Sequence, residues 1–398
     1  MEKTNIKKEY AVLLLSAVTV AVLCGGIGAL FAYTLKTANS LFLKYNWLLF
    51  LLPVGGLLSV WLCNILKVNG QNTSTVFMAA KGQGKVSPLL SVVAFLGTTI
   101  TQLFGGSAGK EGASLQIGGS VTSPIAKLFK IKDENSNILL LCGMTAVFSA
   151  VFMLPLAALA FALEIVFISR KFYFKAIVPL AASSYIAYYV SNFLGTKHEK
   201  FSIGKLPKLG FNNILKVLAV IVICSAGCLA FCLAIKYTET LFEKLFKNRY
   251  LRVAVGGALI ILLTLLVKNR DYNGGGMHII EYVLHGGQTV VYAFALKNLF
   301  TAVTDASGFK GGEIIPALFI GATLGATVGG LIGLPTVFCA ALGMVVLYGG
   351  GTKCMVSALF LGLEMFGISA FWYFLLAIMI AQMLTLNIGI FHKNEKKG

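Results

Sequence analysis

Long apolar runs separated by short polar connections constrain this chain more than any other feature. A helix crosses a bilayer with about twenty apolar residues, and many of the runs here exceed or fall short of that length. The runs are 11–35, 47–66, 89–104, 138–169, 176–194, 214–235, 253–267, 289–303, 313–332, 336–347 and 355–388. Uneven lengths with internal Gly and Pro predict tilted, broken and re-entrant helices, which a membrane tolerates where they line a protein cavity. We therefore expect an all-α polytopic membrane protein embedded in a lipid bilayer.

The charge pattern favours membrane topology over nucleic-acid binding. Only 12% of the residues are charged and 57% are hydrophobic, whereas soluble domains carry about 25% charged residues. The net charge of +18 comes largely from lysines in connections such as 127–132 and 244–252. Loops rich in Lys and Arg stay cytoplasmic, and both ends of the chain are basic. We expect both termini in the cytoplasm, a location in the inner (plasma) membrane and no nucleic-acid partner. The apolar run 11–35 is too long for a cleaved signal peptide, so cleavage there is disfavoured.

No pattern in the sequence indicates an enzyme, a metal site or a cofactor. Cys224, Cys228 and Cys232 lie at helical spacing, but no His, Asp or Glu lies nearby in that run. Packing is therefore favoured over metal binding as the interpretation of these thiols. The chain has no Ser/His/Asp grouping, no HExxH and no phosphate-loop pattern, so we expect no enzymatic activity.

The charged, glycine-dense segment GGSAGKEGASLQIGG at 105–119 interrupts this apolar sequence. Its central Glu111 would be costly at membrane depth without a task or a partner. The clustered glycines indicate that one helix ends and another begins. A helix that begins inside a bilayer presents unpaired N–H groups and the positive end of its dipole, which suit an anion. The segment predicts an anion site gated by the titratable Glu111.

The second half of the chain echoes the first at a shift of about 200 residues. With that shift, Gly143 matches Gly343 and Glu164 matches Glu364, within an ungapped stretch that also pairs Met144 with Met344. The segment GFKGGEIIP at 308–316 again runs from glycines through a glutamate, Glu313, into an apolar run. Matching glycine-interrupted segments in two halves are typical of a transporter binding site at a repeat interface. Close helix packing is the alternative explanation of the glycines.

The repeat predicts a simple domain organisation, with a boundary in the polar stretch 196–209. We expect a cytoplasmic N-terminal segment at 1–10, a first membrane repeat at 11–195, a linker at 196–211, a second repeat at 212–391 and a basic cytoplasmic tail at 392–398.

With these motifs the chain resembles the CLC family of anion channels and proton-coupled antiporters. GKEG at 109–112 followed by LQIGG matches the family's gating-glutamate motif, with Ala113 where proline is usual, and GGEIIP at 311–316 matches the second anion loop. The resemblance implies a CLC-type fold of two inverted-topology repeats, a homodimer with one pore per subunit, and an anion held by backbone amides at helix ends. The anion-binding residues that it implies in these motifs are Gly109, Lys110, Gly112, Gly312, Ile314 and Ile315.

Three departures from the common family pattern are similar to the fluoride-selective branch. The first anion loop reads GQNTS at 70–74 in place of a serine between glycines. Glu313 stands where chloride-handling members are usually apolar, and Ile165 where proton-coupled chloride members often place a second carboxylate. The resemblance implies a fluoride/proton antiporter that exports fluoride in exchange for protons. The alternative is a chloride/proton antiporter or a chloride channel of the same family.

Physical chemistry is consistent with fluoride as the transported ion. Fluoride is small and strongly hydrated, so a selective site needs several donors to replace its water. Side-chain amides of Gln71 and Asn72 supply such donors. Glu313 would repel the ion when charged and donate to it when protonated, which couples proton and anion occupancy and adds it to Glu111 as a proton-transfer group. A surface loop carboxylate near Lys310 is the alternative for Glu313.

Two further candidates rest on weaker patterns. The family commonly places a tyrosine near the C-terminus against the anion, but here no tyrosine follows Tyr373, and Phe391 is the nearest aligned aromatic residue. Its ring edge is weakly positive and suits an edge-on anion contact, with packing as the alternative. Lys110 either attracts anions to the mouth of the site or extends its ammonium group to the interface.

Overall fold

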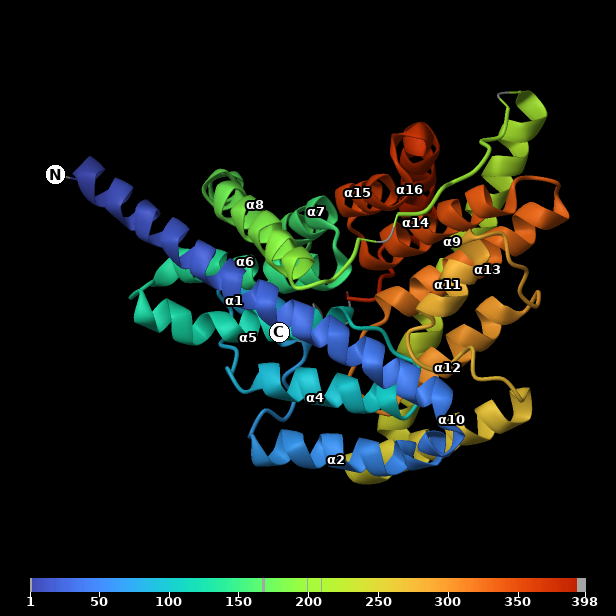
Figure 1. The fold of residues 1–398 in the computed structure, drawn as a ribbon, viewed down its shortest axis with the longest axis horizontal. Coiled ribbons are helices and arrows are strands. Elements are labelled where there is room, and N and C mark those ends of the chain that lie inside the picture. Colours follow the sequence, from blue (N-terminus) through green and yellow to red (C-terminus); the bar gives the residue numbers. More distant parts are fainter. Residues whose placement is uncertain (1, 167–168, 199, 209, 392–398) are drawn as a thin grey trace. The chain divides into compact units, whose positions relative to one another are not determined.

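The structure is a computed structural model that describes residues 2–166, 169–198, 200–208 and 210–391. Throughout this part of the chain the regular structure is helical, with no β-strand. The all-α prediction is therefore confirmed. Figure 1 shows the helices, coloured along the sequence.

The helices fall into two series of eight in the described residues. The first series is α1 (Glu2–Lys44), α2 (Leu52–Ile65), α3 (Thr73–Ala80), α4 (Leu90–Leu103), α5 (Glu111–Leu128), α6 (Asp133–Phe152), α7 (Pro155–Ile165) and α8 (Arg170–Phe193). The second is α9 (Phe211–Leu245), α10 (Arg249–Val267), α11 (Met277–Leu284), α12 (Ala293–Ala306), α13 (Ile314–Leu331), α14 (Thr336–Thr352), α15 (Met355–Phe366) and α16 (Phe371–Thr385). Short 3-10 helices, Asn46–Leu51 and Ile368–Ala370, precede α2 and α16.

The two series repeat each other in order and length. The helices α3 and α11 each have 8 residues, α4 and α12 each have 14, and α5 and α13 each have 18. Both α6 and α14 end at a non-glycine residue in the left-handed conformation, Met153 with φ 59° and Lys353 with φ 66°. Such residues are uncommon, so the recurrence of this helix end at a spacing of 200 residues supports the internal repeat read from the sequence.

Glycines bring consecutive helices of each series into close contact. A Cβ atom on Gly118 of α5 would lie 2.1 Å from the carbonyl oxygen of Gly143 in α6. In the second series, a Cβ atom on Gly321 of α13 would lie 2.4 Å from the carbonyl oxygen of Gly343 in α14. Close helix packing, considered above as the alternative role of the glycines, therefore accounts for Gly118 and Gly321, which both lie inside helices.

The chain forms two compact units, each built from three separate stretches of sequence. The first comprises Met1–Lys36, Leu62–Leu96 and Gly112–Glu199, and the second comprises Thr37–Trp61, Gly97–Glu111 and Lys200–Gly398. Compact units and internal repeats are different divisions of a chain, so the predicted boundaries at 11–195 and 212–391 stay a prediction. The division matters for the site because Glu111 and Glu313 belong to the same unit.

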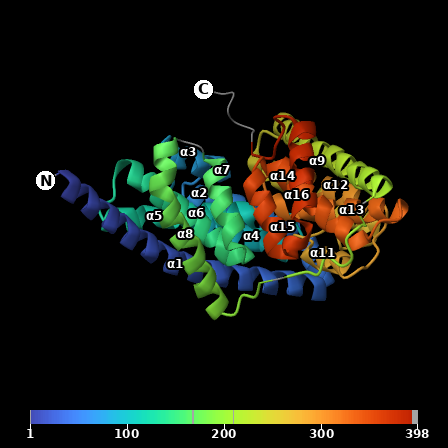
Figure 2. The same cartoon turned by 90° about the horizontal axis from the view of Figure 1, so that it is seen from above.

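Each unit has a helix buried over most of its length. In the first unit, α6 packs against α8 (Figure 2), and every side chain from Ile138 to Val151 is buried. In the second unit, α14 lies beside α13 and α16 and is buried from Phe338 to Thr352. These helices are apolar on all faces, as expected of helices enclosed by other helices.

Seven helical stretches in the described residues are long and apolar enough to cross a membrane. They are Lys8–Lys44, Asn46–Ile65, Asp133–Phe152, Phe211–Leu245, Arg249–Val267, Ile314–Leu331 and Ile368–Thr385. Large apolar side chains such as Ile223 of α9 and Leu266 of α10 are exposed, which is unfavourable in water and suits contact with lipid. The prediction of a multi-pass membrane protein is confirmed, while the location of the termini stays a prediction.

Candidate functional site

Glu111 is the first residue of α5 and is completely buried. Its Oε1 atom accepts a hydrogen bond of 2.6 Å from the backbone N–H of Ile315, the second residue of α13. Its other oxygen, Oε2, is buried without a hydrogen-bond partner. The sequence-predicted gate and the sequence-predicted second anion loop therefore meet through one carboxylate.

The loops that precede α5 and α13 are bonded to each other. The N–H of Gly109 donates to the carbonyl oxygen of Gly312 at 2.6 Å, and the N–H of Gly312 donates to the carbonyl oxygen of Gly109 at 3.1 Å. These two amides hold the loops together here, so their predicted role as anion donors stays a prediction. Ile314 and Ile315 lie in the first turn of α13, where backbone N–H groups have no intrahelical acceptor.

Close approach explains why glycine occupies two positions of these loops. A Cβ atom on Gly109 would lie 2.2 Å from Oε2 of Glu111, and one on Gly311 would lie 2.3 Å from the Cβ atom of Ala108. Real Cβ atoms do not approach other heavy atoms so closely. The Glu111 carboxylate therefore folds back over Gly109, and any side chain at position 109 would displace it.

Glu313 occupies the N-cap position of α13, with φ −102°. Its side chain is half-buried, and the residue lines a small pocket together with Ser107, Thr301, Thr304 and other residues. Glu313 is thus neither an exposed loop carboxylate, which was the alternative interpretation, nor fully enclosed as Glu111 is.

The predicted donors of the first anion loop have their oxygen atoms already engaged. Asn72 caps α3, with Oδ1 accepting the N–H of Thr75 at 3.1 Å. Oε1 of Gln71 accepts the N–H of Ser87 at 3.1 Å. Because a backbone N–H identifies each acceptor as oxygen, the NH₂ groups of both side chains stay available as donors. Both residues lie in the first unit, and their role at the anion stays a prediction.

The remaining predicted residues fall in different surroundings. Gly112 is buried as the second residue of α5, and Lys110, just before α5, is half-buried. Phe391 follows Ile390, whose N–H donates to the carbonyl oxygen of Gly351 at 2.7 Å, so its backbone lies near the C-terminal end of α14. The contribution of these residues to anion binding stays a prediction.

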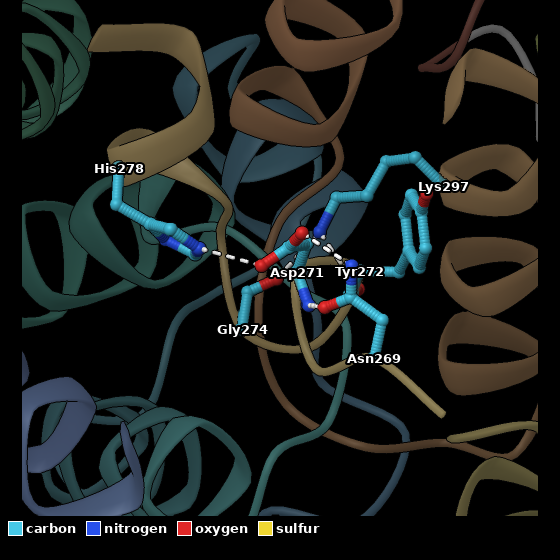
Figure 3. Close-up of polar contacts among 6 residues, drawn as sticks. All are labelled: Asn269, Asp271, Tyr272, Gly274, His278 and Lys297. Atoms are coloured by element: carbon cyan, nitrogen blue, oxygen red, sulfur yellow. Dashed lines mark hydrogen bonds and ion pairs between the residues drawn. The ribbon is translucent and has the colours of Figure 1, made fainter. Parts of the chain in front are cut away.

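Sequence analysis missed Lys297 of α12, which is completely buried. Its Nζ atom donates to the carbonyl oxygens of Gly274 at 2.7 Å and Tyr272 at 3.1 Å (Figure 3). The Nζ atom also donates to Oγ of Ser107 at 3.0 Å. It also lies 5.4 Å from the centre of the Phe319 ring. A lysine inside the apolar run 289–303 is the signal that would have found it, because a charged residue within a membrane run is rarely without a role.

Asp271, in the loop that supplies those carbonyl oxygens, forms an ion pair with His278 of α11. Oδ1 of Asp271 lies 3.7 Å from Nε2 of His278, and Nδ2 of Asn269 donates to the other carboxylate oxygen at 2.5 Å (Figure 3). The interaction with His278 lowers the pKa of Asp271 below its ordinary value. Among the described residues no group of three or more His, Cys, Asp or Glu is placed to hold a metal ion.

Comparison with known proteins places this architecture in a family. The model of a family described as voltage gated chloride channel matches residues 55–386 of the chain. The chain belongs to the voltage gated chloride channel family. This membership confirms the resemblance read from the motifs at 109–119 and 311–316.

Individual members of the family are similar over nearly the whole chain. A chloride/fluoride channel protein of Pseudomonas syringae pv. tomato is 27% identical over 98% of this chain and 88% of its own length. A CLC-type fluoride/proton antiporter of known crystal structure is 27% identical, with a TM-score of 0.90 over 96% of this chain and 97% of that one. A slow cyanobacterial Cl⁻/H⁺ antiporter, 18% identical, has a TM-score of 0.83 over 94% of each chain and shows the shared fold.

Proposed function

We propose that this protein is a fluoride/proton antiporter that exports fluoride in exchange for protons. The observation that carries the proposal is the hydrogen bond of 2.6 Å from the Ile315 N–H to the buried carboxylate of Glu111. An amide at a helix N-terminus that binds a carboxylate also suits a halide, because both are anions that accept N–H hydrogen bonds. The similarity to a CLC-type fluoride/proton antiporter supports the same conclusion.

Glu111 links the two ions through competition for one donor. In its ionised form the carboxylate occupies the Ile315 N–H, and an anion is excluded from that position. Protonation removes the negative charge and weakens the charge-assisted hydrogen bond. The unpartnered Oε2 atom is a place for the arriving proton. The neutral side chain then leaves, and an anion replaces it at the helix end.

Glu313 provides a second protonatable group on the anion pathway. It stands at the N-cap position of the same helix whose amide binds Glu111, and its side chain is half-buried. A charged carboxylate there repels an anion, while a protonated one donates a hydrogen bond to it. Fluoride is a hard acceptor that gives up its water only to strong donors, so a site containing a protonated carboxyl group favours fluoride over chloride.

A chloride/proton antiporter of the same fold is the second candidate, favoured by the shared fold with a Cl⁻/H⁺ antiporter. A chloride channel needs no second carboxylate, so the position of Glu313 at the start of α13 argues against a chloride channel.

We further propose a homodimer with one pore per subunit in the inner membrane, with both termini in the cytoplasm.

Reconstitution into liposomes tests the proposal directly. Purified protein should release trapped fluoride, measured with a fluoride electrode, and should take up protons in proportion, measured with a pH electrode. An imposed proton gradient should drive fluoride uphill, and chloride should move far more slowly. Equal rates for the two halides would reject fluoride selectivity, and fluoride flux without proton movement would reject antiport.

A further inference from the structure

A small pocket lies beside the Glu111 segment within the second unit. It is lined by Ser107, Ala108, Thr301, Thr304, Asp305, Phe309, Gly311, Gly312 and Glu313. Its free space is about that of one water molecule. The lining combines three hydroxyl groups and two carboxyl groups, so the pocket is polar and suited to a small polar occupant.

Counting hydrogens shows that the pocket has a free donor. Oγ of Ser107 and Oγ1 of Thr301 are 3.0 Å apart, and one hydroxyl donates to the other. Lys297 also bonds to Oγ of Ser107, but an ammonium group only donates and consumes no hydroxyl hydrogen. Two hydroxyl groups therefore share one bond between them, and one hydrogen is left without an acceptor. Both side chains are buried and both residues line the pocket, so that hydrogen is available to an occupant.

The hydrogen of the third hydroxyl group is already used. Oγ1 of Thr304 donates to the carbonyl oxygen of Phe300 at 2.8 Å and accepts the N–H of Ser107 at 3.0 Å. This second bond holds Ser107 in position without consuming its hydroxyl hydrogen. Thr304 thus supports the donor, and only the pair Ser107 and Thr301 supplies it.

Charges around the pocket select the kind of occupant. Lys297 does not line the pocket, but its ammonium group donates a hydrogen bond to Oγ of Ser107. This bond polarises the Ser107 hydroxyl, so that its hydrogen carries more positive charge. Asp305 and Glu313 oppose an anion when ionised, but each becomes a further donor when protonated. An anion therefore fits this pocket only together with protons on the carboxyl groups.

We propose that this pocket is a fluoride-binding site, distinct from the helix-end position held by Glu111, in which fluoride accepts the free hydrogen of Ser107 or Thr301 and a hydrogen from a protonated carboxyl group. The inference rests on the proposed antiport of fluoride and protons. Fluoride is close to a water molecule in size and fits the space, whereas chloride is larger. The pocket thereby contributes to selectivity and makes fluoride occupancy depend on protons.

The hydrogen count predicts an unusual pattern among variants. In Ser107→Ala the Thr301 hydrogen has no partner and faces the pocket, and in Thr301→Val the Ser107 hydrogen does. Each single variant therefore keeps one donor and should change the KM for fluoride by less than about twofold. The double variant has no hydroxyl donor, although the protonated carboxyl groups remain, and it should raise the KM about tenfold, which corresponds to about 1.4 kcal/mol. Fluoride efflux from liposomes at a series of internal fluoride concentrations gives these constants.

Thr323→Val is the matched control, because Thr323 is equally buried and its hydroxyl donates to the carbonyl oxygen of Phe319 within α13. It should leave the KM unchanged. A double variant that behaves like Thr323→Val would overturn the proposal, and so would a full loss in either single variant. Wild-type protein that moves no fluoride would instead reject the proposed function itself.

Asp305 offers a second test that does not depend on the folding of the double variant. Asp305→Asn keeps a neutral donor in the pocket and should preserve the KM for fluoride, whereas Asp305→Leu removes the donor and should raise the KM. Equal values of the KM for these two variants would overturn the proposal.

Discussion

The carboxylate of Glu111 accepts a hydrogen bond from the N–H of Ile315, a residue 204 positions later in the sequence. This contact joins the start of α5 to the start of α13. A buried carboxylate loses its hydration, and a helix-end amide together with the positive end of the helix dipole replaces part of it. This replacement is incomplete, because Oε2 remains without a hydrogen-bond partner. Protonation of the carboxylate therefore easily shifts the side chain between its bound and released positions. Such a group is suited to leave its position when it gains a proton.

Replacement of Glu111 by Gln should separate the two ion movements. Glutamine has the same shape but carries no titratable proton, so proton uptake should fall at least tenfold while some anion flux persists. Simultaneous fluoride and pH electrode recordings from liposomes measure both. Glu134→Gln, which removes a partly exposed carboxylate paired with Lys175 at 3.3 Å, is the control and should behave as wild type. Full proton coupling in Glu111→Gln would contradict the gating role.

Glu313→Gln tests whether the N-cap residue of α13 carries protons. If it does, proton movement per fluoride should fall several-fold, because the first turn of α13 contains no other acidic residue that could take over the proton. The number of protons moved per fluoride, measured with the same electrodes in liposomes containing wild-type protein or Glu313→Gln, tests this prediction. Unchanged coupling would assign Glu313 a structural role at the helix end.

A methyl group at position 109 should disable the gate without a change of charge. In Gly109→Ala the added Cβ atom would overlap Oε2 of Glu111, at 2.2 Å, and force the carboxylate away from Ile315. We expect fluoride transport to fall at least tenfold. Gly26→Ala in α1 is the control, because a Cβ atom there meets nothing within 4 Å and alanine favours a helix by about 1 kcal/mol over glycine. Normal transport by Gly109→Ala would show that the carboxylate position is not critical.

Loss of the buried ammonium group should destabilise the protein. Lys297→Met keeps the length of the side chain but leaves the carbonyl oxygens of Tyr272 and Gly274 without this donor. A buried acceptor without a partner costs about 1–3 kcal/mol. Thermal unfolding in detergent should therefore begin at a lower temperature than in wild type. Lys236→Met, at an exposed position of α9, should not change the unfolding temperature; equal behaviour of the two variants would exclude a structural role for Lys297.

Local patterns in the sequence were sufficient for the architecture of the chain. Apolar runs predicted a helical membrane protein, because long continuous apolar segments can cross a bilayer as helices that satisfy their own backbone hydrogen bonds. The glycine-rich breaks at 105–119 and 308–316 predicted where helices restart, and α5 and α13 begin inside those segments. Motif resemblance then indicated the family, which the match over residues 55–386 confirms.

The contacts of the site were decided only by tertiary structure. Ser107 lies 190 residues before its partner Lys297, and 194 before Thr301, so no local period of a helix relates them. The position of Lys297 inside the apolar run 289–303 is visible in the sequence, but its burial and its acceptors are known only from the fold. Sequence by itself determined where the helices form and break, because those depend on neighbouring residues and on the membrane. Which donor faces which acceptor depended on packing between distant segments, and that relation exists only in the folded chain.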